Sequence, residues 1–491
     1  MRTTTSVIII GAGIGGLAAA ALLSAHGIRV TLFERLNSAG GKMRTVPSEA
    51  GDVDAGPTVL TLRYVFDELF ESLGHRLEDH LTLIPLPCLA RHFWSDGTQL
   101  DLPADPSQRH TEIERVFGRK AAADFAAFSH RARSLFDAFD NPMMRNAAPR
   151  ISSLARQVMR NPQLFRHMAP GQTLAGLAFR TISEPRLAQL VARYATYVGG
   201  SPWQTPALLS LIWEAEAKGV WSIDGGMHRL ARAIETLAVA RGAAIHYGTP
   251  VARILTNNGH ACGVRSVIGD HFADAILFNG DPRALRTGAF GQEFSTGVPR
   301  AATEPRSLSA DVLAFSARSD GVELSYHNVF FGDEPRAEFA QLERGQRPSD
   351  ATLYLCAQDR SRGPVKRIER FETIRNAPPL NKWPIVKEDD QCLDAILRRF
   401  QEFGLTFSPK PDITNLTDPT MFNALFPASQ GSLYGRSPRG LTAAMKRPTA
   451  RSAVPGLYLC GGGTHPGAGV PMAALSGRHA TEAILTDLTS I

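Results

Sequence analysis

The sequence predicts an α/β protein in which one domain, a parallel sheet covered by helices, is assembled from three separate stretches of chain. Three observations support this fold class. Patterns of a strand, a glycine-rich turn and a helix occur near the start, in the middle and at the end of the 491 residues. Helical periodicity broken by prolines runs from about 110 to 220, and strand-like runs alternate with polar loops from about 300 to 405. We therefore expect a second, inserted domain that combines a mixed sheet with a helical lid.

Each element has a local signal. The letters "SVIII", "GAGIGG", "LAAAALLSAHG" and "IRVTLFER" predict a strand, a tight turn, a helix and a parallel strand in that order. Val65, Leu69 and Leu73 predict a helix after a Gly-Pro turn, and the Asp96-Gly97 turn predicts a β-hairpin. The run "DGGMHRLARAIETLAVARG" begins a second α/β unit, and "GLYLCGGG" followed by "PMAALSGRHATEAILTDL" predicts a closing strand and helix.

These signals divide the chain into five segments. The first domain is expected to comprise residues 1–85, 222–290 and 410–491. The inserted domain, which would hold the substrate, is expected to take its helical lid from residues 86–221 and its sheet from residues 291–409.

Composition excludes several classes of protein. Hydrophobic residues make up 43% and charged residues 20%, which is ordinary globular usage and excludes a disordered or fibrous chain. The formal charge of +6 is too small for this length to imply nucleic-acid binding. Five cysteines without a C-x-x-C pair favour neither a disulfide framework nor a metal site, so we expect a reducing cytoplasm and no metal. Glycines interrupt the apolar run 7–23, which argues against a signal peptide or membrane span.

The first glycine motif predicts a dinucleotide site. Gly11, Gly13 and Gly16 form G-x-G-x-x-G between a predicted strand and helix, where a pyrophosphate can approach backbone N–H groups. Glu34 ends the next strand, where its carboxylate can accept both hydroxyls of an adenosine ribose. These residues leave both NAD and FAD open.

A second glycine pair follows closely. Gly40-Gly41 makes another open turn, and Lys42 and Arg44 supply positive charge beside it. Next to a nucleotide site, neutralisation of phosphate is the better interpretation of these cations than a solvated basic loop.

The combination of motifs resembles the flavin-dependent amine-oxidase and phytoene-desaturase superfamily. The resemblance continues through "VDAGPTVLT", "GGMHRLARAIETLAVARGAAIHYGTPV" and "GLYLCGGGTHPGAGVPMAALSGRHA", the last being similar to the C-terminal signature of bacterial-type carotenoid desaturases. Within these, "DAGPTVLTLRYVFDELF" and "ALFPASQGSLYGRSPRG" are most similar to the 1-hydroxycarotenoid 3,4-desaturase group. The resemblance implies a Rossmann-like FAD-binding domain and desaturation of a 1-hydroxylated acyclic carotenoid by hydride transfer to flavin.

The resemblance also implies roles for particular residues. Lys42 stands where much of the superfamily has arginine, and Pro471 suits the first turn of a helix whose positive end would face the flavin. The implied FAD contacts are Gly11, Gly13 and Gly16 at the pyrophosphate, Glu34 at the ribose, Lys42 and Arg44 at the second glycine turn, Val251 at the adenine, and Gly461, Gly463, Thr464, Val470 and Met472 at the flavin ring.

No residue is identified as the catalytic acid or base. His465 lies inside the closing motif, but a structural histidine bonded to the backbone is the favoured interpretation. Orientation of the polyene and exclusion of water should supply most of the catalysis. Oxygen and a quinone both remain possible as the final electron acceptor.

Three other functions remain in view. A phytoene-type desaturase would act on unhydroxylated carotenoids, and a non-catalytic lipid-escort protein could use the same scaffold without flavin. An NAD-dependent dehydrogenase is less favoured because the closing motif would then have no role.

One window suggests contact with a membrane. Residues 141–180 contain six arginines and no acidic residue, with Ile151, Leu154 and Val158 on one helical face. Such a segment suits an anionic membrane surface, although a solvated helix with a core-facing stripe fits the same pattern. We expect a cytoplasmic protein that binds the membrane peripherally through this window.

Overall fold

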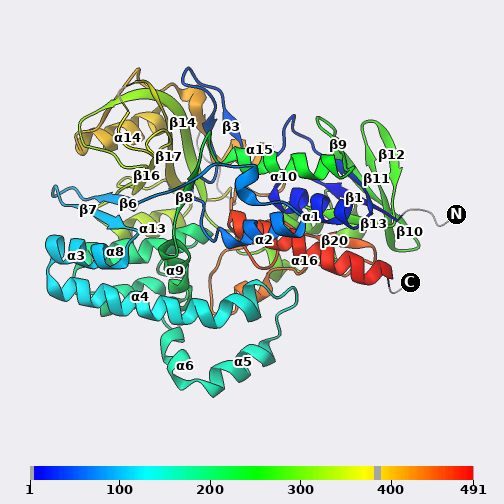
Figure 1. Cartoon of the computed structure of the whole chain (residues 1–491), viewed down its shortest axis with the longest axis horizontal. Helices are drawn as coiled ribbons and strands as arrows, with labels where there is room; N and C mark the ends of the chain where they lie inside the picture. Colours follow the sequence, from blue (N-terminus) through cyan, green and yellow to red (C-terminus); the bar gives the residue numbers. More distant parts are fainter. Residues whose placement is uncertain (1–4, 366, 381–388, 490–491) are drawn as a thin grey trace.

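The computed structural model describes residues 5–365, 367–380 and 389–489, and two β-sheets organise them (Figure 1). One sheet with its helices contains the first and last parts of the chain. The other sheet lies beside it, together with most of the remaining helices. This arrangement confirms the predicted α/β class with an inserted mixed sheet and helical lid.

The first sheet is parallel, with the strand order β20-β13-β1-β2-β9. Its strands are β1 (Ser6–Ile10), β2 (Arg29–Phe33), β9 (Ala244–His246), β13 (Ala275–Phe278) and β20 (Leu457–Leu459). They come from three distant stretches of the sequence. All of β1 is buried at the centre of this sheet, which explains its unbroken β-branched run.

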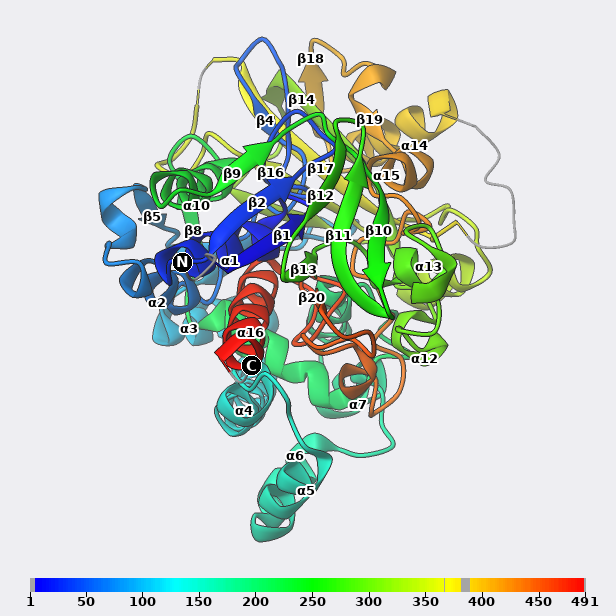
Figure 2. The ribbon, with the colours of Figure 1, turned by 90° about the vertical axis from the view of Figure 1, so that its right-hand side faces the viewer.

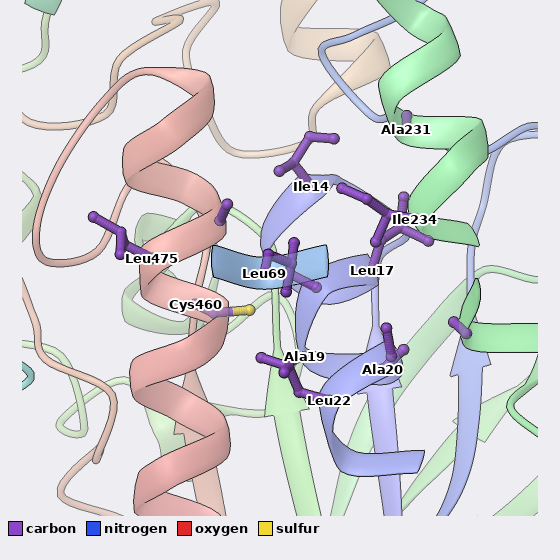
Figure 3. Close-up of a cluster of buried hydrophobic side chains, with 14 of the residues drawn as sticks. Ile14, Leu17, Ala19, Ala20, Leu22, Leu69, Ala231, Ile234, Cys460 and Leu475 are labelled. Carbon is purple, nitrogen blue, oxygen red and sulfur yellow. The ribbon is translucent and has the colours of Figure 1, made fainter. Parts of the chain in front are cut away.

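Three helices cover one face of this sheet: α1 (Ile14–Ala25), α10 (His228–Ala240) and α16 (Val470–Thr489). Figure 3 shows α1 between the other two, with Leu17 near Ile234 of α10 and Leu475 projecting from α16. The crossing of α1 and α16 is close, because a Cβ on Gly477 would lie 2.3 Å from Gly15 O. Glycines on both helices, Gly15 on α1 and Gly477 on α16, thus let the first and last helices of the chain pack against each other.

An antiparallel sheet covers the opposite face. It consists of β10 (Val251–Asn257), β11 (His260–Ser266) and β12 (Gly269–Phe272), visible beside β13 in Figure 2. Ile254 and Val264 pack against Ile8 and Ile276 of the parallel sheet.

The second sheet is mixed, with the order β18-β14-β17-β16-β15-β6-β7 and β19 paired to β14. Its strands are β6 (Cys88–Phe93), β7 (Gln99–Pro103), β14 (Ser309–Asp320), β15 (His327–Phe330), β16 (Leu353–Ala357), β17 (Glu369–Ala377), β18 (Thr406–Ser408) and β19 (Leu416–Thr417). Strands β6 and β7 form the hairpin predicted at Asp96-Gly97. Helix α14 (Asp389–Glu402) packs on one face, where Phe400 meets Phe330 and Phe371.

Helices within residues 106–217 form the lid, as the helical periodicity broken by prolines predicts. They are α3 (Pro106–Phe117), α4 (Arg119–Phe139), α5 (Ile151–Arg160), α6 (Pro162–Met168), α7 (Leu174–Thr181), α8 (Pro185–Arg193) and α9 (Ile212–Ala217), with the short 3₁₀ turn η3 (Tyr194–Val198). Phe125 and Trp213 of this region pack with Leu100 and Phe331 of the mixed sheet. Helices α5 and α6 project away from the rest of the molecule in both views (Figures 1 and 2).

Shorter elements complete the fold. They are β3 (Thr45–Val46), β4 (Val53–Asp54), α2 (Tyr64–Ser72), β5 (Leu83–Pro85), β8 (Trp221–Ile223), α11 (Pro282–Arg286), α12 (Arg300–Thr303), α13 (Pro335–Glu343) and α15 (Pro419–Leu425). Helix α2 is the one predicted from Val65, Leu69 and Leu73, all of which are buried. None of the helices in the described ranges combines the length and apolar character needed to cross a membrane.

Candidate functional site

The first glycine turn joins the end of β1 to the start of α1. Gly11 has φ +102°, a conformation that side chains rarely adopt. A Cβ on Gly16 would lie 2.3 Å from Gly11 O, so the turn closes only with glycine at position 16. Gly13 is the N-cap of α1, and no side chain of the described residues caps the helix. The first N–H groups of α1 are therefore available to an anion.

Glu34 follows β2 and lies against this turn. Its Oε2 accepts a hydrogen bond from Ala12 N (2.7 Å) and its Oε1 one from Leu36 N (2.8 Å). Thr249 N donates to Glu34 O (2.8 Å), so the chain that enters β10 at Val251 passes the same edge of the sheet. The predicted ribose and adenine residues thus lie at the carboxyl ends of the parallel strands, where open α/β sheets bind ligands.

The second glycine turn lies across the first. Gly40 N donates to Ala12 O (2.9 Å), and Gly13 pairs with Gly40 in a parallel bridge. A Cβ on Gly41 would lie 3.1 Å from the Cα of Gly13. The two turns therefore form a continuous backbone surface.

The two cations after this turn have different surroundings. Lys42 Nζ donates to Leu433 O (2.5 Å), in the loop that leads to the C-terminal motif. Arg44 Nη2 instead donates to Thr417 Oγ1 (2.6 Å) on β19 of the mixed sheet. Both cations therefore have a protein partner: Lys42 contacts the loop before the C-terminal motif, and Arg44 contacts the mixed sheet.

The C-terminal motif meets the N-terminal turn directly. A Cβ on Gly15 would lie 2.9 Å from Gly461 N, and Gly461 N donates to Ser476 Oγ on α16 (2.7 Å). Thr464 Oγ1 donates back to Gly461 O (2.7 Å) and so holds this turn closed. The structure brings the two ends of the chain into contact, and we call the site formed by the turns around Gly13, Gly41 and Gly461 the groove.

The remaining predicted residues follow from that turn. A Cβ on Gly463 would lie 2.5 Å from Cδ of Pro282, at the start of α11. Val470 begins α16, and Met472 lies in its first turn. A Cβ on Gly462, by contrast, meets no atom of the described residues within 4 Å, which marks open space beside this run.

Asn279, which the sequence analysis did not identify, joins these parts. It follows β13, and its Nδ2 donates to Gly11 O (2.9 Å) and Gly13 O (3.2 Å). Its Oδ1 accepts a bond from Cys460 Sγ (3.4 Å). One side chain from the middle of the sequence therefore links the first glycine turn to the last strand.

A buried cluster with excess positive charge lies beside the groove. Arg306 pairs with Asp281, while Arg447 donates to Gly462 O (3.0 Å) and Tyr434 O (2.9 Å). Burial lowers the pKa of Lys42 to about 8; Asp281 opposes this shift, and the cations of Arg306 and Arg447 reinforce it. Burial also lowers the pKa of Arg447 to about 10. Three cations that share one carboxylate suit a bound diphosphate.

The lowered pKa of Lys42 links stability to pH. An unfolded chain protonates this lysine up to about pH 10.5, so between pH 8 and pH 10.5 the unfolded state binds more protons than the folded state. The free energy of unfolding should therefore rise with pH in this window, by up to about 3 kcal/mol from Lys42. A bound dianion would raise the pKa of Lys42 and remove this gain.

His465 is held as a structural residue. Its Nε2 forms a hydrogen bond with Asn146 O (2.8 Å), and its ring stacks on His479 with centroids 5.7 Å apart. Burial lowers its pKa to about 4, so the ring is neutral at pH 7. The favoured interpretation of His465, a structural histidine bonded to the backbone, agrees with this geometry.

These features together fit a dinucleotide. Two glycine turns and a helix start offer N–H groups, Lys42 and Arg447 offer positive charge, and Glu34 lies at the ribose end. Gly462 borders open space at the other end, where a planar ring can lie.

Comparisons with known proteins agree with this geometry. The family model described as flavin containing amine oxidoreductase matches residues 14–485. A hydroxyneurosporene desaturase of Cereibacter sphaeroides is 52% identical over 99% of this chain and 98% of its own. One of Rhodobacter capsulatus is 47% identical over 100% and 99%. Among solved structures, an oxidoreductase from Methanosarcina mazei aligns with a TM-score of 0.62 at 18% identity over 97% of this chain and 100% of its own. Cyclohexylamine oxidase from Brevibacterium oxydans aligns with a TM-score of 0.58 at 18% identity over 99% and 100%.

Proposed function

Because the chain belongs to the flavin-containing amine oxidoreductase family, we propose that it is an FAD-dependent desaturase of 1-hydroxylated acyclic carotenoids that introduces the 3,4 double bond. The family match confirms the predicted superfamily and FAD as the cofactor. The observation that carries the substrate class is the full-length identity with two proteins named hydroxyneurosporene desaturase.

The chain's own residues would bind and orient the cofactor. FAD, when bound, supplies the acceptor for a hydride that leaves the substrate. Gly11, Gly13 and Gly16 allow the backbone to approach the diphosphate, Lys42 neutralises it, and Glu34 accepts the ribose hydroxyls. Held by the Thr464 bond, the C-terminal glycine turn would lie along the flavin ring.

Two features of the chain favour hydride transfer. The first turn of α16 begins at Val470, and its positive end stabilises negative charge that develops nearby. The mixed sheet and the lid pack around a largely apolar core, which would keep water away from a substrate bound beside it. Residual cationic character on the substrate spreads over the polyene, so orientation carries most of the catalytic burden.

Anaerobic reduction of the bound flavin tests this proposal. Purified protein mixed with a 1-hydroxylated acyclic carotenoid should lose the absorbance of oxidised flavin and yield the 3,4-desaturated product. Faster reduction by unhydroxylated carotenoids would identify a phytoene-type desaturase instead. Protein that stays colourless after addition of FAD would support the lipid-escort alternative and overturn the proposal.

We further propose that α5 and α6 dock on an anionic membrane from which the substrate is taken. Exposed Ile151 (64%), Met159 (76%) and Phe165 (55%) project from these helices, which stand away from the body (Figure 2). Apolar tips flanked by arginines suit the interface of a bilayer. The exposed arginines of this region are Arg150, Arg156, Arg160, Arg166 and Arg180.

The structure changes the interpretation of the apolar face of α5. Leu154 and Val158 pack against a small cluster that includes Leu135, so this face of α5 is directed toward the protein. Arg145 pairs with Glu68 on α2. The part of α5 offered to a membrane therefore consists of its exposed residues, namely Ile151 at the start of the helix, Met159 and the arginines.

Liposome flotation tests the membrane proposal. Arg150, Arg156, Arg160 and Arg166 changed together to Gln should weaken binding to vesicles that contain anionic lipid, because each arginine near such a surface contributes about 1 kcal/mol. A control protein carries the same change at four exposed arginines elsewhere, Arg336, Arg344, Arg362 and Arg398. Equal flotation of the two variants would remove the membrane role of α5 and α6.

A further inference from the structure

A small enclosed cavity lies between the mixed sheet and the lid. Its volume is about 10 Å³, so it holds a group about as large as one water or one hydroxyl. Its walls come from β6, β15 and β16 of the sheet, from α8, η3 and α9 of the lid, and from the loop after β4. The polar lining residues used below are Arg193, Tyr194, Tyr197, Glu216, His327 and Tyr354.

His327 has unused hydrogen-bonding capacity at this cavity. Its ring is 2% exposed, and Nδ1 forms a hydrogen bond with the Tyr354 hydroxyl (2.6 Å). The Tyr354 hydroxyl is in turn 2.7 Å from Thr58 Oγ1. Within the described residues, Nε2 of His327 has no partner. A buried polar atom without a partner is rare and signals a missing ligand or water.

Most other polar groups at the cavity are already paired. The hydroxyls of Tyr194 and Tyr197 donate to the two oxygens of Glu216 (2.8 and 2.5 Å). The guanidinium of Arg193 lies over the rings of Tyr197 and Tyr354, 5.9 Å from each centroid. Arg193 donates and never accepts, whereas a neutral imidazole can accept at its free nitrogen. Burial, followed by the charge of Arg193, lowers the pKa of His327 to about 3, so its ring is neutral.

Segments that flank the cavity run on to the cofactor groove on two sides. Thr58 stands two residues after Gly56, whose Cβ would lie 2.0 Å from Lys42 O at the second glycine turn. On the other side, a Cβ on Gly199, which ends η3, would lie 2.4 Å from the Tyr434 ring. Arg447 holds Tyr434 O and Gly462 O together. The segments that flank the cavity therefore also contact the turns that would hold the flavin.

We propose that His327, oriented by Tyr354, and Arg193 bind the hydroxyl of the substrate and thereby select hydroxylated carotenoids. The inference rests on the proposed function. A hydroxyl both donates and accepts, which matches an acceptor nitrogen on His327 and a donor on Arg193. In a 1-hydroxylated chain the hydroxyl-bearing carbon is two bonds from carbon 3, so a site that binds this hydroxyl must adjoin the flavin. The segments shared by the cavity and the glycine turns fit this requirement, and the hydrocarbon would extend along the groove.

The test is the ratio of flavin reduction rates with a 1-hydroxylated carotenoid and with its unhydroxylated analogue. His327→Phe should lower this ratio about 10- to 100-fold, because the bound hydroxyl then lacks its partner. His327→Gln, whose amide can donate and accept, should recover most of the ratio. Arg193→Met should lower the same ratio. If the His327→Phe protein does not retain FAD, the Arg193→Met protein takes its place in the test.

His479→Phe is the matched control. His479 is also 2% exposed, also has a ring nitrogen without a partner among the described residues, and lies on α16 outside the cavity. Its substitution should leave the ratio unchanged even if the protein is less stable. If the hydroxylated polyene reduces the wild-type flavin but the ratio is unchanged in His327→Phe and Arg193→Met, the hydroxyl site is wrong and the proposed function stands. A wild-type flavin that no polyene reduces would overturn the proposed function as well.

Discussion

Asn279 offers the sharpest test of how the groove is held. Its amide donates to Gly11 O and Gly13 O, both in the first glycine turn. Asn279→Leu keeps a side chain of similar size and removes both donors. At about 1 kcal/mol for each net hydrogen bond, the turn loses about 2 kcal/mol of preorganisation. The FAD affinity should therefore fall by up to about 30-fold, because ordering of the turn is then part of binding.

FAD affinity is measured by titrating apoprotein with FAD and monitoring the quenching of flavin fluorescence. The free energy of unfolding of each variant is measured in parallel. Asn328→Leu is the control. Asn328 is fully buried on β15 and also donates two bonds, to Ser325 O (2.7 Å) and Leu355 O (3.2 Å). Its loss should lower stability and leave FAD affinity unchanged. A folded Asn279→Leu protein that binds FAD as tightly as wild type would refute the role of this residue.

Four further changes probe the same groove. In FAD titrations, affinity should fall above pH 8 for wild type and stay constant for Lys42→Arg, because arginine keeps the proton that favours the diphosphate; constant wild-type affinity up to pH 9.5 would contradict this. Gly16→Ala should weaken FAD binding at least about fivefold, because overpacking of the turn costs about 1–3 kcal/mol. Gly462→Ala should leave the unfolding free energy of the apoprotein unchanged, because the added methyl group meets no atom of the described residues. It should weaken FAD binding, because the methyl group would occupy the open space beside the turn. His465→Gln should keep the rate of flavin reduction within about threefold, whereas loss of a true general base would lower it at least about 100-fold in stopped-flow traces.

The sequence predicted those parts of the groove whose chemistry depends on local spacing. Gly11, Gly13 and Gly16 occur within six residues, and the strand, turn and helix they join form one continuous segment. Glu34 follows at the end of the next strand because a strand–helix–strand unit has a nearly fixed length. Such residues need no knowledge of the rest of the fold.

Other residues of the groove depend on contacts between distant segments, and the sequence did not reveal them. Asn279 is 268 residues from Gly11, its partner, and Lys42 reaches Leu433 across 391 residues. A polar residue directly after the buried run "AILF" was the available signal for Asn279, because ligands bind at the carboxyl ends of such strands. Arg447 had no comparable signal, since it follows no strand and belongs to no motif.

The lid illustrates the same limit for charge. Counting residues assigned six uncompensated cations to 141–180, but Arg145 pairs with Glu68, which lies 77 residues away on α2. The periodicity of α5 identified an apolar face correctly, yet it could not say whether that face meets protein or membrane. Leu154 and Val158 pack against the small cluster around Leu135, so half of the helix faces the protein.

The loop after β4 connects the two parts of the fold that would hold the cofactor and the substrate. Asp54 accepts bonds from Met227 N (2.6 Å) and His228 N (3.0 Å) at the start of α10. Gln358, directly after β16, bonds both Asp54 N (3.0 Å) and Asp54 O (2.9 Å). Four residues later Thr58 reaches Tyr354 on β16. The parallel sheet's helix and the mixed sheet are thus tied through one short segment. Because a displacement of about 1 Å can reduce a rate 100-fold, loosening this segment should slow desaturation without removing any group that touches FAD or substrate.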